Sequence, residues 1–203
     1  MHFDKIKNKG QARLFDNELM EEMTKTHPLV IYAMYMPVIA FMLYYGYAYK
    51  GIGIGAEALV FVGGALFWSI FEYVMHRHLF HMIVERPRTQ RFVYTMHGVH
   101  HEYPRDQERL FMPPVPSLVI ATVLFSLFYL IMGWWALAFF SGFLLGYLAY
   151  GSMHFAIHAF KPPKFMKALW RNHHLHHYKS PEKGFGVSSV LWDVVFRTVP
   201  EKD

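Results

Sequence analysis

Four long apolar stretches constrain the fold of this sequence more than any other feature. They cover about residues 29–49, 52–75, 115–132 and 134–159. Each has about 18 residues or more, the length that a helix needs to cross roughly 30 Å of hydrocarbon. Buried helices of a soluble bundle would show a polar face at helical period, but stretches such as SLVIATVLFSLFYLIMGWWALAFF show none. We therefore expect an all-α integral membrane protein with four transmembrane helices.

The basic residues indicate how these helices are oriented. All Lys and Arg residues except Lys50 lie before the first stretch, between the second and third, or after the fourth. Because cytoplasmic loops carry an excess of Lys and Arg, we expect both termini in the cytoplasm and the spans in two hairpins. Residues 76–114 and 160–203 should then form a helical cap on the cytoplasmic face. We interpret residues 1–203 as a single domain that begins with a cytoplasmic segment, residues 1–27.

Composition and charge exclude several classes of function. The absence of cysteine excludes disulfides, cysteine-ligated zinc, iron–sulfur clusters and thiol catalysis. The formal net charge is +5, but the basic residues flank the apolar stretches and form no single stripe interleaved with exposed aromatics. We therefore expect no nucleic-acid partner. The first 27 residues also lack the apolar core of a signal peptide.

Histidine is concentrated in four clusters at one predicted side of the membrane. Of 14 histidines, all but His2 and His27 lie between His76 and His177, and we expect those two to be incidental. The clusters are HRHLFH at 76–81, HGVHH at 97–101, HFAIH at 154–158 and HHLHH at 173–177. Each cluster lies at or beyond the predicted cytoplasmic end of a span, although the charge count did not include histidine.

Helical spacing places most members of each cluster on a common face. Residues three or four apart are separated by about 60° or 40° around a helix. Each such set can therefore point at one metal ion or at two adjacent ones. The sets are His97, His100 and His101; His173, His176 and His177; and the pair His154 and His158.

The first cluster allows two pairings. His78 and His81 are three apart, and ideal helix geometry favours this pair. His76 and His81 are five apart, which separates them by about 140° on a regular helix. A helix that breaks near Arg77 would instead bring His76 and His81 together. Spacing alone leaves both pairings open.

So many neighbouring imidazoles indicate a metal centre. Charged imidazoles would repel each other, whereas a metal ion binds the neutral form through nitrogen. A pH sensor or proton relay would not need paired HxxHH spacing. About ten ligands exceed what one ion can hold, so we expect two ions, for which imidazole suits iron, zinc, copper and nickel. The sequence has no HExxH, so a metalloprotease would lack its expected base, although zinc hydrolysis stays open.

Longer motifs around the histidines carry a family resemblance. They are EYVMHRHLFHM at 72–82, HGVHHEYPRDQERLFMPPVP at 97–116, HFAIH at 154–158 and HHLHHYKSPEKGFGVSSVLWDVVF at 173–196. Over about residues 68–200, the sequence resembles the fatty acid hydroxylase superfamily and, within it, the fatty acid 2-hydroxylases.

This resemblance implies an activity, cofactors and a set of ligands. It implies O2-dependent hydroxylation next to an acyl carbonyl, on a free fatty acid or a sphingolipid N-acyl chain. It implies a dimetal centre, for which we expect two iron ions, and electrons from an external donor; zinc is the alternative occupant in purified samples. Activation of O2 by iron suits attack on an unactivated C–H bond of a membrane lipid. The implied ligands leave out His78 and His174; they are His76, His81, His97, His100, His101, His154, His158, His173, His176 and His177.

The sequence departs from the family pattern in two places. Eukaryotic members often carry an N-terminal cytochrome b5 domain, whereas here only 27 polar residues precede the first span. We therefore expect a separate electron-transfer protein, cytochrome b5-like or ferredoxin-like. We also favour a bacterial cell membrane over the endoplasmic reticulum. The family tends to have Tyr-Asp before its third cluster, and here Tyr150 is followed by Gly151, so a carboxylate beside the site is missing.

A few polar residues outside the clusters are further candidates. Glu72 lies one turn before His76 near the end of an apolar stretch, where a carboxylate is costly and marks a functional site by default. We expect Glu72, and similarly Asp193, to orient a ligand imidazole. Asp106 and Arg109 should hold the cap together as a salt bridge. The candidate hydrogen-bond donors at the site are Tyr103, Tyr150 and Tyr178, although interfacial tyrosines are common in membrane proteins.

Two alternatives remain beside a fatty acyl hydroxylase. Carotenoid hydroxylases and sterol hydroxylases or desaturases share the histidine plan, but the Arg-Leu-Phe-Met-Pro-Pro sequence at 109–114 favours the fatty acyl branch. A membrane metal transporter or sensor would be no enzyme. Transporter sites lie near the bilayer midplane, whereas these histidines lie at the ends of the spans.

Overall fold

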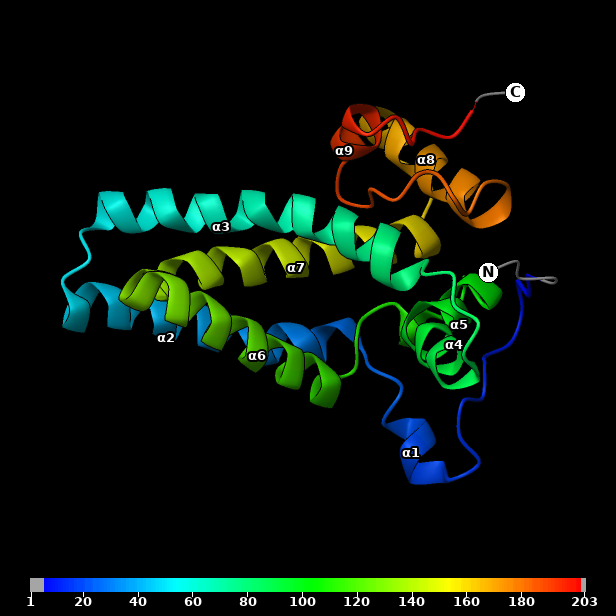
Figure 1. The fold of residues 1–203 in the computed structure, drawn as a ribbon, viewed down its shortest axis with the longest axis horizontal. Helices are drawn as coiled ribbons and strands as arrows, with labels where there is room; N and C mark the ends of the chain where they lie inside the picture. Colours follow the sequence, from blue (N-terminus) through cyan, green and yellow to red (C-terminus); the bar gives the residue numbers. More distant parts are fainter. Residues whose placement is uncertain (1–5, 202–203) are drawn as a thin grey trace.

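Helices and their connections make up the described part of the chain, residues 6–201, in the computed structural model (Figure 1). The predicted features at His2, Lys5 and Lys202 lie outside these residues. No strand occurs between residues 6 and 201, so the all-α prediction is confirmed. The long helices are α2 (Pro28–Lys50), α3 (Ile54–Met75), α6 (Pro114–Met132) and α7 (Ala136–Ala159). The short ones are α1 (Glu18–Glu22), α4 (Pro87–Val93), α5 (Val99–Glu102), α8 (Lys167–Tyr178) and α9 (Leu191–Val195).

The long helices follow the four predicted apolar stretches to within two residues at each end. Gly51 ends α2 in the left-handed region, with φ +65°, a conformation that glycine adopts without steric cost. Gly133, with φ +57°, starts the 3-10 turn η4 (Gly133–Trp135) between α6 and α7. Three helical runs are long and apolar enough to cross a membrane: α2, α3 with its continuation to Phe80, and Gln107–Ala159, which contains both α6 and α7.

Helix α7 is the centre of the bundle, with α3 and α2 packed against it (Figure 1). Two glycines allow α3 and α7 to cross at close range. A Cβ atom on Gly64 would overlap the carbonyl oxygen of Phe139, and one on Gly142 would overlap that of Phe61. Small residues are typical where membrane helices approach closely, because little hydrophobic force pushes such helices together and packing must hold them.

The outer surface of the long helices is apolar. Large side chains such as Leu59, Leu66, Leu130 and Ile131 point away from the protein. Exposed apolar surface on this scale is unfavourable in water but suits contact with lipid chains. With the three candidate spans, this surface makes the chain a membrane protein.

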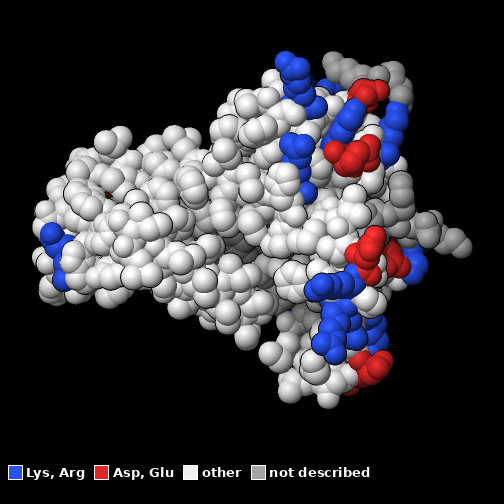
Figure 2. All heavy atoms as spheres, in the orientation of Figure 1, with Lys and Arg blue, Asp and Glu red and all other residues white. Residues whose placement is uncertain are grey.

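The short helices gather at one end of the bundle (Figure 1). Figure 2 shows that almost all the Lys, Arg, Asp and Glu side chains visible in this view lie at that end. Lys50 lies at the other end, at the end of α2, where its Nζ atom is 3.7 Å from the ring centre of Trp134. The charge separation predicted from the sequence therefore corresponds to two ends of the molecule.

The N-terminal segment is fastened to this end by a buried ion-pair network. Arg109 donates to Asp106 Oδ2 at 2.6 Å, so the predicted salt bridge is confirmed. Its guanidinium also pairs with Glu21 of α1 and donates to Thr24 Oγ1 at 3.1 Å. All three charged side chains are buried. The network holds α1 against the 3-10 turn η3 (Gln107–Arg109).

Candidate metal centre

The end of α3 widens into a π-helical turn, η1 (His76–Phe80). In this turn the His81 N–H donates to the His76 carbonyl at 3.2 Å, five residues back. A π turn brings residues five apart onto one side, and the His76 and His81 rings lie 5.1 Å apart between centroids. The helix therefore widens instead of breaking near Arg77, and His78 points outward as an exposed residue. The structure thus brings His76 and His81 together.

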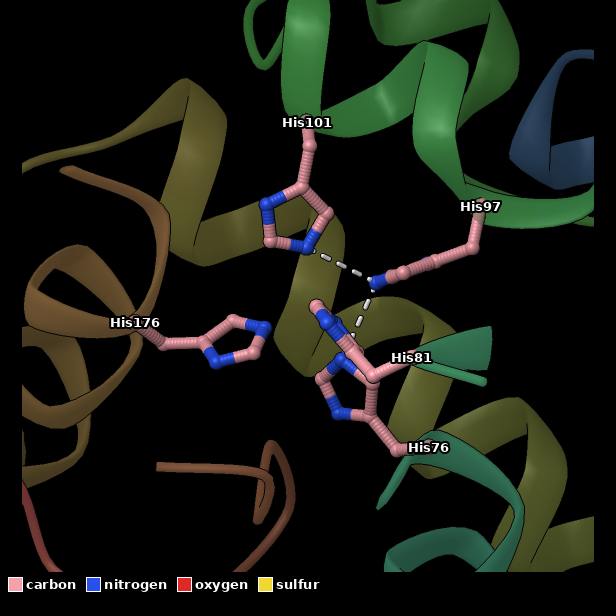
Figure 3. Close-up of side chains that lie close together, drawn as sticks. All are labelled: His76, His81, His97, His101 and His176. Carbon is pink, nitrogen blue, oxygen red and sulfur yellow. Dashed lines mark hydrogen bonds between the residues drawn. The ribbon is translucent and has the colours of Figure 1, made fainter. Parts of the chain in front are cut away.

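Ten histidines converge in two groups of five. One ring nitrogen of each histidine lies within 4.8 Å of those of the other four members of its group. Figure 3 shows the first group, whose side chains point toward a common centre from the π turn at the end of α3, from α5 with the turn before it, and from α8. The first group is His76, His81, His97, His101 and His176. The second group is His100, His154, His158, His173 and His177.

Each HxxHH cluster serves both groups. His97 and His101, four residues apart, belong to the first group, whereas His100 belongs to the second. Helix α8 shows the reverse arrangement, because only His176 of its three inward histidines belongs to the first group. The spacing alone allowed each of these sets to point at one metal ion or at two adjacent ones. The structure divides both HxxHH sets between two adjacent groups. His174 is exposed and belongs to neither group.

The nitrogen positions fit metal ligation better than hydrogen bonding. His97 Nε2 lies 3.0 Å from both His76 Nε2 and His101 Nε2. His100 Nε2 lies 2.8 Å from His154 Nε2 and 3.0 Å from His177 Nε2. A neutral ring nitrogen has one proton or one lone pair, so it cannot satisfy two such partners. Nitrogens about 2.1 Å from one ion and at right angles would be about 3 Å apart.

Two further observations support the same fit. His81 Nε2 and His176 Nε2 are buried without a hydrogen-bond partner. Buried polar atoms are rarely left unpaired, so an orphaned nitrogen in each of two ligand-type side chains needs an explanation. A bound metal ion would use both lone pairs.

Backbone carbonyls hold two of these imidazole rings on the side away from the centre of the group. The Nδ1 atoms of His76 and His176 lie 2.6 Å from the Phe185 carbonyl and 2.7 Å from the Lys183 carbonyl. Nδ1 must carry the proton to donate to a carbonyl oxygen, which leaves Nε2 with its lone pair toward the group. Metal-binding histidines are commonly oriented in this way.

Burial keeps the cap histidines of both groups neutral. Removal from water is the main cause that holds the pKa of each imidazole well below 6.5, and neighbouring imidazoles lower it further. This applies to His97, His100, His101, His173, His176 and His177. The neutral imidazole is the form that binds a metal ion.

Glu72 and Asp193 hold the loop behind His76. Glu72 Oε1 accepts the N–H groups of Val187 at 2.8 Å and Ser188 at 2.9 Å, and its other oxygen contacts the Ser188 hydroxyl. Asp193 is completely buried and accepts the Phe185 N–H at 2.9 Å. Neither carboxylate has a hydrogen bond to an imidazole among the contacts of residues 6–201. Both carboxylates instead bind the backbone of residues 185–188, in which the Phe185 carbonyl contacts His76 Nδ1.

Asp193 also ties this loop to two other segments. Its Oδ2 atom accepts the Gly186 N–H at 2.9 Å and the Asn172 amide of α8 at 3.0 Å. Its Oδ1 atom accepts the Thr198 hydroxyl at 2.8 Å. Sequence reasoning missed the carbonyls of Phe185 and Lys183, because backbone acceptors leave no side-chain signature. The Gly-Phe-Gly motif was the available signal, since Gly184 has φ +76° and Gly186 leaves no room for a Cβ atom.

Two of the three candidate tyrosines lie beside grouped histidines, Tyr178 next to His177 with ring centroids 6.3 Å apart, and Tyr150 next to His154. The Tyr150 ring stacks on His154, with centroids 5.8 Å apart. The Tyr103 hydroxyl instead accepts from Lys7 Nζ at 2.9 Å, and the Tyr178 hydroxyl donates to Asn8 at 2.7 Å. Tyr103 and Tyr178 thus hydrogen-bond to the N-terminal segment.

An apolar cavity of about 580 Å³ adjoins both groups. It runs between α3, α6 and α7, and its wall includes His97 of the first group and both His100 and His154 of the second. Beside His154, the ring of Phe111 fills the place where a side chain at Gly151 would lie. The carboxylate missing at position 151 is thus replaced by an aromatic wall.

This chain is similar to known fatty acid hydroxylases in both sequence and structure. The sequence model of one family, described as fatty acid hydroxylase, matches residues 61–198. The ceramide very long chain fatty acid hydroxylase of Saccharomyces cerevisiae is 37% identical over 98% of this chain and 52% of its own length. A dihydroceramide fatty acyl 2-hydroxylase of Arabidopsis thaliana is 34% identical over 93% of this chain and 80% of its own length.

Two further matches extend this comparison. The fatty acid 2-hydroxylase of Mus musculus is 34% identical over 94% of this chain and 57% of its own length. A solved structure described as full-length scs7p, with only the hydroxylase domain visible, superposes with a TM-score of 0.87 at 36% identity. That match covers 96% of this chain and 75% of the other. The chain spans about half the length of the yeast and mouse relatives.

Proposed function

Because the chain belongs to the fatty acid hydroxylase family, we propose that it hydroxylates a fatty acyl chain at the carbon next to the carbonyl. The observation that supports this most is the pair of histidine groups opening onto an apolar cavity in a membrane protein. The substrate would be a free fatty acid or a sphingolipid N-acyl chain. The names of the relatives from yeast, Arabidopsis and mouse include ceramide, dihydroceramide and fatty acid.

The ten grouped histidines would hold two iron ions, one in each group. When bound, these ions would supply the capacity to activate O2 for attack on an unactivated C–H bond. The chain supplies neutral imidazoles whose Nε2 atoms already point inward. The carbonyls of Phe185 and Lys183 keep two of these rings in the required tautomer. Zinc would be the substitute in purified samples, since imidazole suits both metals.

The cavity would hold the acyl chain and exclude water from the reacting carbon. Apolar side chains such as Phe143 and Leu124 make up most of its wall. A chain that fits against this wall can place one C–H bond next to the ring of His100 or His154. Fixing the reacting bond at the site lowers the entropic part of the barrier, and exclusion of water limits side reactions.

We also propose four transmembrane helices, α2, α3, α6 and α7, with both termini on the cytoplasmic side. The charge-rich end of the bundle, residues 76–114 and 160–203, would be the cytoplasmic cap of a single domain. Electrons would arrive from a separate cytochrome b5-like or ferredoxin-like protein. The membrane would be a bacterial cell membrane or the endoplasmic reticulum.

Expression in a host without 2-hydroxylated lipids tests the reaction. With ¹⁸O₂, we expect mass spectrometry to show ¹⁸O-labelled 2-hydroxy acyl chains. The H101A and H176A variants should lose them, and the H174A variant should keep them, because His174 belongs to neither group. Unchanged host lipids, despite two bound irons and a competent reductant, would contradict the proposal.

A further inference from the structure

An exposed apolar surface lies on the cap, outside the four long helices. It consists of five side chains between residues 191 and 199, each between 43% and 61% exposed. We call it the α9 patch. Its members are Leu191, Val194, Val195, Phe196 and Val199. Contiguous apolar side chains on a water-facing surface are unfavourable, so such patches mark contacts with a partner or a membrane.

The inward side of this segment, which includes one face of the Phe196 ring, is anchored in the protein. The Trp192 indole donates to Ser69 Oγ of α3 at 3.1 Å. The Phe196 ring stacks on Tyr73 of α3, with centroids 5.2 Å apart and 14° between the planes. Asp193 is fully buried among its four hydrogen-bond partners. The outward direction of the α9 patch is therefore fixed by buried contacts.

These anchors place the α9 patch beside the lipid-facing surface of α3. Ser69 and Tyr73 belong to the last turns of α3 before the cap, and α9 lies over that part of the helix (Figure 1). On the same helix, Leu66 and Val74 are exposed apolar residues. The apolar surface of the bundle thus continues from α3 onto the cap.

Basic side chains lie at the border of this surface. Arg197 is exposed and follows Phe196 directly. Arg77, one turn beyond Tyr73 toward the cap, donates to the Tyr73 hydroxyl at 3.0 Å. An apolar face bordered by arginines is typical of segments that lie in the membrane interface, where the cations meet lipid phosphates.

We propose that the α9 patch is embedded in the leaflet of the bilayer on the cap side, with Arg197 and Arg77 at the level of the phosphates. This rests on the proposed spanning arrangement of α3. Lipid fits better than a protein partner, because the patch continues a surface that already faces lipid. One consequence is chemical: Asp193, on the inner face of α9, holds Phe185, whose carbonyl meets His76. The membrane would thereby support one side of the histidine site.

The absence of cysteine makes a direct test possible, because one introduced cysteine carries the only label. Nitroxide labels would be placed on V194C and V195C in the full chain, loaded with metal and reconstituted in nanodiscs of phosphatidylcholine and phosphatidylglycerol. Electron spin resonance then measures collisions with O2, which enters lipid, and with a water-soluble nickel chelate. L130C on α6 is the lipid reference, and E182C on the exposed surface of the cap is the water reference.

We expect both patch labels to resemble L130C, with a ratio of O2 to nickel collisions several-fold above that of E182C. A ratio equal to that of E182C would overturn the proposal. So would low collision rates with both reagents, which would indicate a second copy or another protein on the patch. A water-like result at L130C would instead contradict the proposed spans themselves. Two bound metal ions per labelled chain would show that each variant is folded.

Discussion

The imidazole rings of His101 and His177 stack with their centroids 4.2 Å apart, although the two residues belong to different groups of five. The two groups therefore share a wall made of their own histidines. Helix α8 and the α5 segment each contribute to both groups, so one helix cannot shift without disturbing both.

Removal of one ligand should reduce metal binding at its own group first. We expect H176A to lower the metal content from two ions per chain to about one, since the first group loses one of its five nitrogens. Inductively coupled plasma mass spectrometry of the purified protein measures this. H174A and H78A are the controls, because both side chains are exposed and outside the groups. Two tightly bound ions in H176A would exclude His176 as a ligand.

The D193N variant should weaken the site without touching any imidazole. An amide nitrogen in place of one carboxylate oxygen would face N–H or O–H donors, and each buried donor left without an acceptor costs about 1–3 kcal/mol. We expect a lower melting temperature and metal retention reduced about 10- to 100-fold, as for other residues that orient a ligand. The same change at exposed Asp16 should alter neither quantity. Equal behaviour of the two variants would contradict the anchoring role.

Gly151 should tolerate no side chain while Phe111 keeps its position. The new Cβ atom of G151A would overlap the Phe111 ring, and overpacking of this kind costs about 1–3 kcal/mol. We expect a lower melting temperature and less product, with partial recovery in the double variant G151A/F111L. Gly63 on α3 is the matched control, because its Cβ position is open and G63A should leave stability unchanged or slightly higher. A fully stable G151A would show that Phe111 moves freely.

Arg109 should determine how firmly the N-terminal segment is held. R109M would leave Glu21 and Asp106 as buried carboxylates without a cation, a loss of about 3–5 kcal/mol. We expect much faster trypsin cleavage after Lys25 at the same protease concentration. The exposed pair of Arg13 and Glu18 provides the control, since surface ion pairs contribute about 0–1 kcal/mol. Similar digestion rates of R109M and R13M would contradict the role of Arg109 in holding the N-terminal segment.

The metal-free protein should lose stability as the pH falls below about 6.5. Histidines of the unfolded chain bind protons near pH 6.5, whereas burial depresses the pKa of the folded cap histidines well below that value. The unfolded state then binds more protons, and each histidine concerned removes about 1.4 kcal/mol per pH unit. Melting temperatures in detergent should be constant above pH 7 and fall steadily toward pH 5. A melting temperature that rises in this range would contradict the burial of neutral imidazoles.

The parts of this structure that depend on local periodicity were predictable from the sequence. The long helices follow from apolar runs, and Gly51 and Gly133 mark where two of them end. The pairs His97 with His101 and His173 with His177 follow from α-helical spacing and do meet in single groups. Local spacing could not decide between His76 and His78, because a π turn brings residues five apart onto one side, which regular α-helical spacing does not predict.

The roles of Glu72 and Asp193 were harder to predict from the sequence for a different reason. Glu72 bonds to residues more than 100 positions later in the chain, and its partners are backbone N–H groups. The sequence indicated that the two carboxylates lie near the histidines. It did not indicate that the loop at residues 185–188 lies between the carboxylates and His76. For Gly151, the sequence indicated a missing carboxylate, whereas the ring of Phe111 in its place depends on tertiary packing.

The sharing of α8 between the two groups also has a consequence for biosynthesis. Neither group is complete before α8, because His176 completes the first and His173 and His177 complete the second. All four long helices precede α8 in the chain, so the membrane bundle emerges from the ribosome before either five-histidine site can exist. If each group takes an ion, as proposed, full metal loading would have to follow the synthesis of α8 and would therefore come after that of all four long helices.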